Sequence, residues 1–129
     1  ITKGLIFQKL KNFKDITLDG FHNIDGMNTL IQNLPTNRKI LICSFLNNKK
    51  YTQMLTKLSE HFQKIIVVQM NEENSITKKD LPTNLKLIFC PSLKNSVKTI
   101  NQYSNSLTSI YFGGSLYFIG EFLKLNQSK

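Results

Sequence analysis

The sequence predicts an α/β domain with a mainly parallel sheet of about five or six strands and helices on both faces. Apolar runs such as residues 39–46 and 64–70 are nearly unbroken, as in strands that are covered on both sides. Amphipathic segments with helical spacing lie between such runs, so strand and helix alternate along the chain. The length of 129 residues suits one domain, residues 1–129, with one core.

In the first half of the chain the pattern predicts three strands and two helices. Residues 4–10 alternate loosely between apolar and polar, which favours an edge strand, and residues 15–18 form a short strand. A helix follows and ends at Pro35, and residues 39–46 form the next strand. A polar turn at residues 47–50 leads into the second helix. The apolar faces of these helices are Met27, Leu30, Ile31 and Leu34 in the first, and Tyr51, Met54, Leu55, Leu58 and Phe62 in the second.

In the second half the pattern predicts three further strands and two helices. Residues 64–70 are rich in β-branched side chains and form the clearest strand. After a polar segment at residues 71–80, residues 86–90 form a buried strand, and Ser92 is the expected N-cap of the next helix. Residues 106–112 form the last strand, and a helix closes the chain. The inward side chains of these two helices are Leu93, Val97, Ile100 and Tyr103, then Leu116, Ile119, Phe122 and Leu123.

Composition and charge exclude several classes of protein. The net charge of +9 comes almost wholly from lysines that are scattered along the chain, with Arg38 as the single arginine. Nucleic-acid readers cluster their basic residues and rely on arginine, so we expect no nucleic-acid partner. No apolar run of about 18 residues exists, so we expect no membrane span.

Cys43 and Cys90 lie in apolar runs far apart, which predicts buried thiols in a cytoplasmic protein. We also expect a monomer. The first residue is Ile rather than Met, which suggests a piece of a longer protein.

The strand-to-helix turns are where function is expected. Right-handed crossovers place all of these turns at one edge of a parallel sheet, the edge where open α/β sheets bind ligands. Here they are residues 19–23, 47–50, 70–73, 90–92 and 113–115.

The first turn has the richest set of polar groups. Asp19 ends a strand, Gly20 permits a sharp turn, and His22 and Asn23 precede a helix. A carboxylate can bind a ribose diol or an ammonium, and a helix beginning at Asn23 favours an anion nearby. An ordinary turn with a capping Asn and a solvated His fits the same residues.

Two other turns add weaker candidates. Gly113 and Gly114 precede Ser115, which can present N–H groups and a hydroxyl to an anion, although a simple cap at Ser115 fits equally well. Lys49 or Lys50 can meet a phosphate, although lysines in turns are commonly just solvated. The phosphate-binding pattern G-x-x-x-x-G-K-[ST] is absent from the chain.

Together these turns resemble the motifs of one known family. The segment LDGFHN at residues 18–23 resembles L-D-G-A-H-N-P. Residues 48–50 (NKK) stand where the family has D-K-D, and residues 113–117 (GGSLY) stand where it has T-G-S-L-Y. Order and spacing agree across nearly the whole chain. The chain is thus similar to the C-terminal domain of folylpolyglutamate synthase / dihydrofolate synthase, in the Mur ligase superfamily, which has a Rossmann-like sheet.

The resemblance implies an ATP-dependent carboxylate–amine ligase of folate metabolism. In that family, ATP with Mg²⁺ converts a carboxylate of folate or dihydropteroate into an acyl phosphate, which the amine of L-glutamate attacks. The P-loop and the Mg²⁺ site belong to an N-terminal domain, so this chain would close over the nucleotide together with its own N-terminal domain and be inactive alone. By resemblance, Asp19, Asn23 and Lys49 would bind the nucleotide. His22 would be catalytic and, with Ser115, would bind substrate.

Three departures from the family pattern bear on its function. Ile24 replaces a proline, Asn48 and Lys50 replace an acidic pair, and Leu5 stands where the family has an arginine near the nucleotide. Two hypotheses therefore remain. The chain is the closing domain of a folate-type ligase, or it is a non-catalytic α/β module that kept the fold and binds an anionic ligand or a protein.

Overall fold

Five parallel strands form a single sheet in the order β1-β5-β2-β3-β4. The structure is a computed structural model and describes residues 4–127. The strands are β1 (Asp15–Leu18), β2 (Lys39–Cys43), β3 (Lys64–Val68), β4 (Ile88–Cys90) and β5 (Ser109–Gly113). The helices are α1 (Leu5–Lys9), α2 (Ile24–Gln32), α3 (Tyr51–Leu58), α4 (Leu93–Asn101) and α5 (Leu116–Gln127), with a short 3₁₀ helix η1 (Lys78–Asp80). The predicted α/β class is confirmed, and the sheet is wholly parallel.

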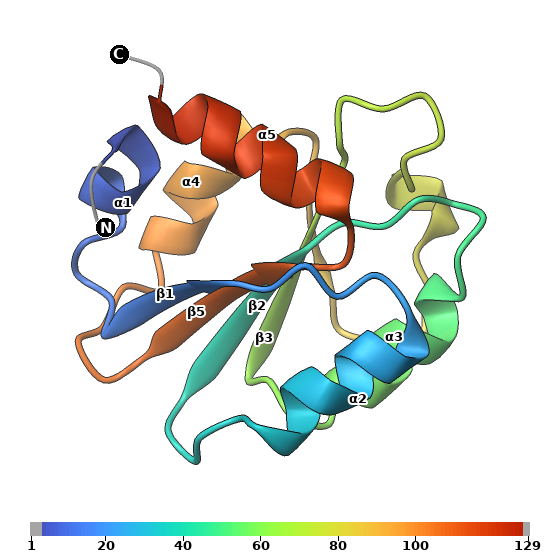
Figure 1. Cartoon of the computed structure of the whole chain (residues 1–129), viewed down its shortest axis with the longest axis horizontal. Helices are drawn as coiled ribbons and strands as arrows, with labels where there is room; N and C mark the ends of the chain where they lie inside the picture. Colours follow the sequence, from blue (N-terminus) through green and yellow to red (C-terminus); the bar gives the residue numbers. More distant parts are fainter. Residues whose placement is uncertain (1–3, 128–129) are drawn as a thin grey trace.

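Helices cover both faces of the sheet, with α1, α4 and α5 on one side and α2 and α3 on the other (Figure 1). Every residue of the central strand β2 is buried. Ile40 and Ile42 belong to the core beneath α1, α4 and α5, whereas Leu41 and Cys43 belong to the core beneath α2 and α3. Since alternate side chains enter two different cores, the strand reads as an unbroken apolar run.

The edge strand expected at residues 4–10 is wrong, because this segment contains the helix α1. Ile6 and Leu10 are both fully buried in the core beneath α4 and α5. Their four-residue spacing is typical of a helix. The loose apolar–polar alternation of residues 4–10 hid this spacing. No side chain at Gly4 caps the helix. Instead, Asn126 of α5 accepts hydrogen bonds from the Ile6 and Phe7 N–H groups at 2.8 and 3.1 Å.

Several predicted boundaries also shift. The apolar run 39–46 leaves the sheet after Cys43, although Ser44 and Phe45 stay buried and Leu46 forms only an isolated bridge to Ser75. Burial therefore extends beyond strand pairing, and apolar character alone cannot mark where a strand ends. The runs 64–70, 86–90 and 106–112 likewise contain the shorter or displaced strands β3, β4 and β5.

The inward face of the last helix is only partly as expected. Phe122 is fully buried and Ile119 packs against the core, but Leu116 and Leu123 are 60% and 47% exposed. Phe118 fills the core position instead. Leu116 and Leu123 are therefore corrected from core to surface.

Both cysteines are buried and unpaired, as the sequence predicts. Complete burial raises the pKa of the Cys43 thiol, because the charged thiolate is costly in the core. Within residues 4–127, no helix has the length and apolar character needed to cross a bilayer.

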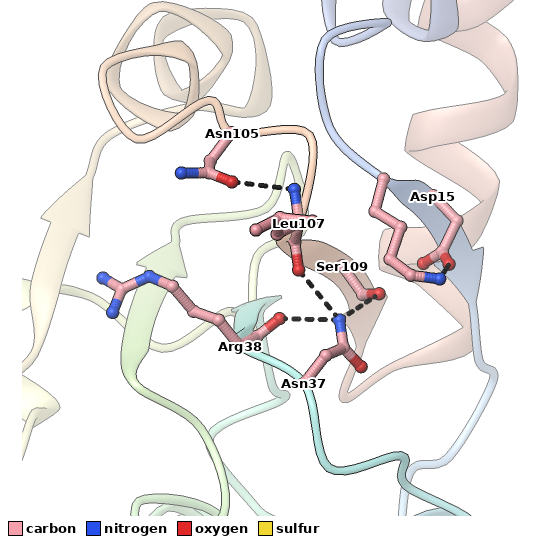
Figure 2. Close-up of polar contacts among 7 residues, drawn as sticks. Asp15, Asn37, Arg38, Asn105, Leu107 and Ser109 are labelled. Atoms are coloured by element: carbon pink, nitrogen blue, oxygen red, sulfur yellow. Dashed lines mark hydrogen bonds and ion pairs between the residues drawn. The ribbon is translucent and has the colours of Figure 1, made fainter.

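Side chains tie the loops together at the amino end of the sheet (Figure 2). The Asn37 amide lies 3.1, 3.1 and 3.0 Å from the Arg38 and Leu107 carbonyls and the Ser109 hydroxyl. These contacts join the loop before β2 to the loop before β5. The turns described next lie at the opposite, carboxyl end.

Candidate functional site

At the carboxyl ends of the neighbouring strands β1, β5 and β2, the chain does not always leave the sheet toward the same face. The chain leaves β1 toward α2 on one face of the sheet, whereas it leaves the neighbouring β5 toward α5 on the other face (Figure 1). Diverging turns on adjacent strands leave a crevice between them, which is the usual ligand site of open α/β sheets. The three turns that resemble family motifs follow these three strands.

Side chains shape the turn after β1. The Asp19 carboxylate accepts a hydrogen bond from the Phe21 N–H at 2.9 Å, which closes the turn on itself. The His22 Nδ1 lies 3.0 Å from the Gly20 carbonyl oxygen. A carbonyl can only accept, so Nδ1 must carry the hydrogen in this contact. In the neutral form of the ring, the lone pair then lies on Nε2. His22 is exposed to solvent.

Asn23 is the N-cap of α2, as predicted. Its side-chain oxygen accepts from the Gly26 N–H at 2.8 Å, so the amide is committed to the helix. Asp25 lies in the first turn of α2 and already opposes the positive end of the helix dipole. An anion at this site must therefore be attracted mainly by other groups.

The turn after β2 supplies those groups. Lys49 and Lys50 are exposed, and within the described part of the chain neither forms an ion pair. The first turn of α3, which follows them, contains no acidic residue. The two ammonium groups therefore provide the cationic side of the crevice.

The turn after β5 is tightly constrained. Gly114 has a φ of +104°, which side chains rarely adopt. Ser115 is 3% exposed, and its hydroxyl accepts from the Tyr117 N–H at 3.1 Å, so it caps the start of α5. The simple cap considered for Ser115 is therefore present, and its hydroxyl hydrogen remains available to a ligand.

Backbone hydrogen bonds join the three turns. The Asp19 N–H donates to the Phe112 carbonyl at 2.8 Å, and the Gly114 N–H donates to the Phe21 carbonyl at 3.1 Å. The Ser44 N–H donates to the Gly113 carbonyl at 3.2 Å. The turns after β1 and β2 are thus both attached to the turn after β5, and the crevice walls have a defined spacing.

Two adjoining cavities occupy the crevice, of about 400 and about 100 Å³. His22 and Lys49 line both, so the structure brings these two predicted residues together. Asn23 lines the larger cavity and Ser115 the smaller one, whereas Asp19 lines neither. The remaining lining residues are Ile24, Asp25, Asn48, Lys50 and Met54 in the larger cavity, and Leu46, Gly114, Leu116 and Tyr117 in the smaller one.

The lining chemistry suits a small anionic ligand. The larger cavity falls in the usual size range of ligand sites and combines the two ammonium groups and one carboxylate, that of Asp25, with an imidazole and amides, so positive charge prevails. Residues 4–127 contain no group of three or more His, Cys, Asp or Glu side chains that could hold a metal ion. This part of the chain therefore supplies no complete metal site of its own.

Phe21 was missed as a residue of the site. It is 4% exposed, although the residues that follow it in the turn are open to solvent. Its ring meets that of Phe45, which follows β2, edge to face with centroids 6.3 Å apart. The sequence feature that could have identified Phe21 is a single aromatic residue within an otherwise polar turn.

The fold matches a part of several ligases in solved structures. A folylpolyglutamate synthase/dihydrofolate synthase from Yersinia pestis, complexed with AMPPNP and Mn, aligns with a TM-score of 0.76 at 14% identity, over 84% of this chain and 28% of that chain. Mycobacterium tuberculosis folylpolyglutamate synthase complexed with ADP aligns with a TM-score of 0.74 at 16% identity, over 88% and 30%. E. coli FolC in complex with DHPP and ADP aligns with a TM-score of 0.75 at 16% identity, over 85% and 28%.

These matches establish the fold and its extent. This chain spans less than a third of the enzymes it resembles, which is the size of one domain. The predicted similarity to a domain of folylpolyglutamate synthase/dihydrofolate synthase is therefore confirmed at the level of structure. No protein-family model matches the sequence, and no curated protein matches it by sequence.

Proposed function

We propose that this chain is the C-terminal domain of an ATP-dependent ligase that adds L-glutamate to a folate or dihydropteroate carboxylate. The observation that carries the proposal is the convergence of three turns, residues 19–23, 48–50 and 113–117, around one crevice. Each of these turns resembles a motif of the same ligase family, and the shared fold supports the same assignment. The domain closes over the nucleotide and positions the incoming glutamate.

The crevice residues fit the phosphate end of a nucleotide. Lys49 and Lys50 supply positive charge at the larger cavity, and the Asn23 cap holds the start of α2 beside them. Asp19 uses one carboxylate oxygen to close its turn and keeps the other for a ribose hydroxyl. ATP would supply the phosphoryl group that activates the carboxylate, and Mg²⁺ would be held by an N-terminal domain outside this chain.

Two residues suit the glutamate side. In its neutral form, His22 has a lone pair on Nε2, which can accept a proton from the amine of glutamate as that amine attacks. The Ser115 hydroxyl accepts from the backbone and can donate to a carboxylate. The catalytic effect is positioning and charge stabilisation between two domains rather than covalent catalysis.

The competing hypothesis is a non-catalytic module that binds an anion or a protein. It is favoured by Leu5, which stands where the family has arginine and lies in α1, a helix that packs against α5 and α4. The cytoplasmic location and the monomeric state remain predictions under both hypotheses.

The reading frame and the enzyme assay separate the two hypotheses. The ligase hypothesis requires a G-x-x-x-x-G-K-[ST] motif some two to three hundred residues upstream of Ile1, since the nucleotide site needs a P-loop. The full-length protein should then release ADP only when L-glutamate and a folate or dihydropteroate acceptor are both present. The 129-residue chain alone should release none. A frame without the motif would leave the non-catalytic module as the function.

Variants test the assigned residues in the full-length protein. Asp19→Ala and His22→Gln should each lower turnover by about ten-fold or more, in line with other lost positioning groups. Lys86→Gln is the control, because Lys86 is exposed and lies just before β4, at the end of the sheet opposite the three turns. Unchanged kcat and KM in the Asp19 or His22 variant would remove that residue from the site.

A further inference from the structure

Phe21 belongs to the turn after β1 and contacts both the turn after β5 and the segment that follows β2. Its N–H donates to the Asp19 carboxylate at 2.9 Å, and its carbonyl accepts from the Gly114 N–H at 3.1 Å. Its ring meets the ring of Phe45 at a centroid distance of 6.3 Å. Phe21 therefore joins the turn after β1 to Phe45, just after β2, and to the turn after β5. His22, which lines both cavities, is the next residue in the chain.

The ring of Phe21 occupies the space that a side chain at Gly113 would need. A Cβ atom at Gly113 would lie 2.3 and 2.7 Å from two ring carbons of Phe21, and 2.8 Å from the Asp19 carbonyl oxygen. The backbone at Gly113 does not itself require glycine, because only Gly4 and Gly114 among the described residues have positive φ. The absent side chain at Gly113 is thus explained mainly by Phe21.

We propose that Phe21 is a positioning residue and that Phe21 and Gly113 form a matched pair which sets the crevice geometry. The inference rests on the proposed function only in taking this crevice as the functional site. The ring holds the backbone on either side of it, so His22 and Ser115 face the crevice from fixed positions. The pair also coincides with two differences from the family motifs, where an alanine and a threonine stand at these positions.

Buried aromatic side chains fill their sites closely, and removing one leaves a void that the surroundings only partly close. Gly113 has no side chain that could fill such a void. Without the ring, the turn at residues 19–23 can move relative to the turn at residues 113–115, and the spacing of the crevice is lost.

A double-mutant cycle on the 129-residue chain tests the pairing. Phe21→Val removes both ring atoms that block Gly113 while keeping a buried apolar side chain. Gly113→Ala should lower the urea midpoint of the wild type, and at least half of that fall should disappear in the Phe21→Val background. Part of it should remain, because the Asp19 carbonyl still lies 2.8 Å from the new Cβ.

Gly120→Ala is the control for the cycle. A Cβ at Gly120 meets nothing within 4 Å, so its effect should be the same in both backgrounds. If the Phe21→Val chain does not fold, Phe21→Leu replaces it, since that variant still removes the closer ring atom. An equal fall for Gly113→Ala in both backgrounds would overturn the pairing.

Positioning is tested separately from stability by imidazole ¹⁵N spectra. The chain has two histidines, and His61 lies beside Phe62, another buried aromatic of the same core. Phe21→Val should shift the His22 ring signals and leave those of His61 unchanged. Phe62→Val should do the reverse, although it also lowers stability.

The Gly114 amide gives a second readout. Its hydrogen exchange should accelerate in Phe21→Val more than in Phe62→Val, because its acceptor is the Phe21 carbonyl. If Phe21→Val and Phe62→Val had equal effects at His22 and Gly114, Phe21 would be an ordinary core residue and not a positioning residue. Neither readout depends on nucleotide or ligase activity, so a failure of the proposed function leaves the result interpretable.

Discussion

Replacing Gly114 by alanine tests whether the turn after β5 is as constrained as its geometry indicates. The φ of +104° is a region that side chains rarely adopt, and holding alanine there costs about 1–3 kcal/mol. The new Cβ would also lie 2.3 Å from the Ser44 carbonyl oxygen, a backbone atom that no rotamer change can move. The turn must therefore shift, which weakens the hydrogen bond to the Phe21 carbonyl at a cost of about 1 kcal/mol.

The expected loss of unfolding free energy is about 2–4 kcal/mol. The same substitution at Gly120 should have the opposite sign, because a Cβ there meets nothing within 4 Å. Gly120 lies inside α5, where alanine is favoured over glycine by about 0.5–1 kcal/mol. Two Gly→Ala changes six positions apart thus form a matched pair.

Urea unfolding followed by circular dichroism measures both variants, and thermal unfolding checks them. In a domain of this size, each kcal/mol corresponds to a shift in Tm of roughly 3–5 °C. Gly114→Ala should lower the urea midpoint and Gly120→Ala should raise it slightly. A Gly114→Ala midpoint equal to that of the wild type would refute the constraint on this turn and, with it, the fixed spacing of the crevice walls.

Two further predictions concern the core. Asn126→Ala removes the acceptor of the Ile6 and Phe7 N–H groups, so the free energy of unfolding should fall by about 1–3 kcal/mol in urea titrations. Asn126→Asp keeps an acceptor, so its free energy of unfolding should fall less. The exposed Gln127→Ala should leave the free energy of unfolding unchanged. Equal losses in all three variants would argue against the cap. Burial raises the pKa of the Cys43 thiol above its ordinary 9.0, so at higher pH the unfolded chain loses a proton that the folded chain keeps. Stability should therefore fall as pH rises above about 9, by up to about 1.4 kcal/mol per unit from this group. Cys43→Ala should remove that part of the slope, and parallel slopes for the two proteins would contradict the assignment.

Local sequence patterns predicted most of the framework. The caps at Asn23 and Ser92 and the apolar faces of α2, α3 and α4 were readable because they depend on residues within one or two helical turns. The turn that presents His22 was predictable for the same reason. The apolar runs also located the buried strands, since a strand covered on both faces cannot alternate with polar residues.

Other features depend on residues distant in sequence. Asn126 caps α1 from 120 positions away, so no local pattern reveals how the start of this helix is satisfied. The ends of β2 and β3 are set by where neighbouring strands stop pairing, and apolar composition does not report that.

In the candidate site, too, some features follow from the sequence and others only from the tertiary structure. The sequence alone determined that Asp19, His22, Lys49 and Ser115 follow strands at one edge of a parallel sheet. Only the tertiary structure decided that His22 and Lys49 share two cavities, that Asp19 lines neither, and that Phe21 occupies the space beside Gly113. The physical reason is that β5 inserts between β1 and β2. That order brings together turns that are some ninety residues apart, and no periodicity in the sequence encodes which strands become neighbours.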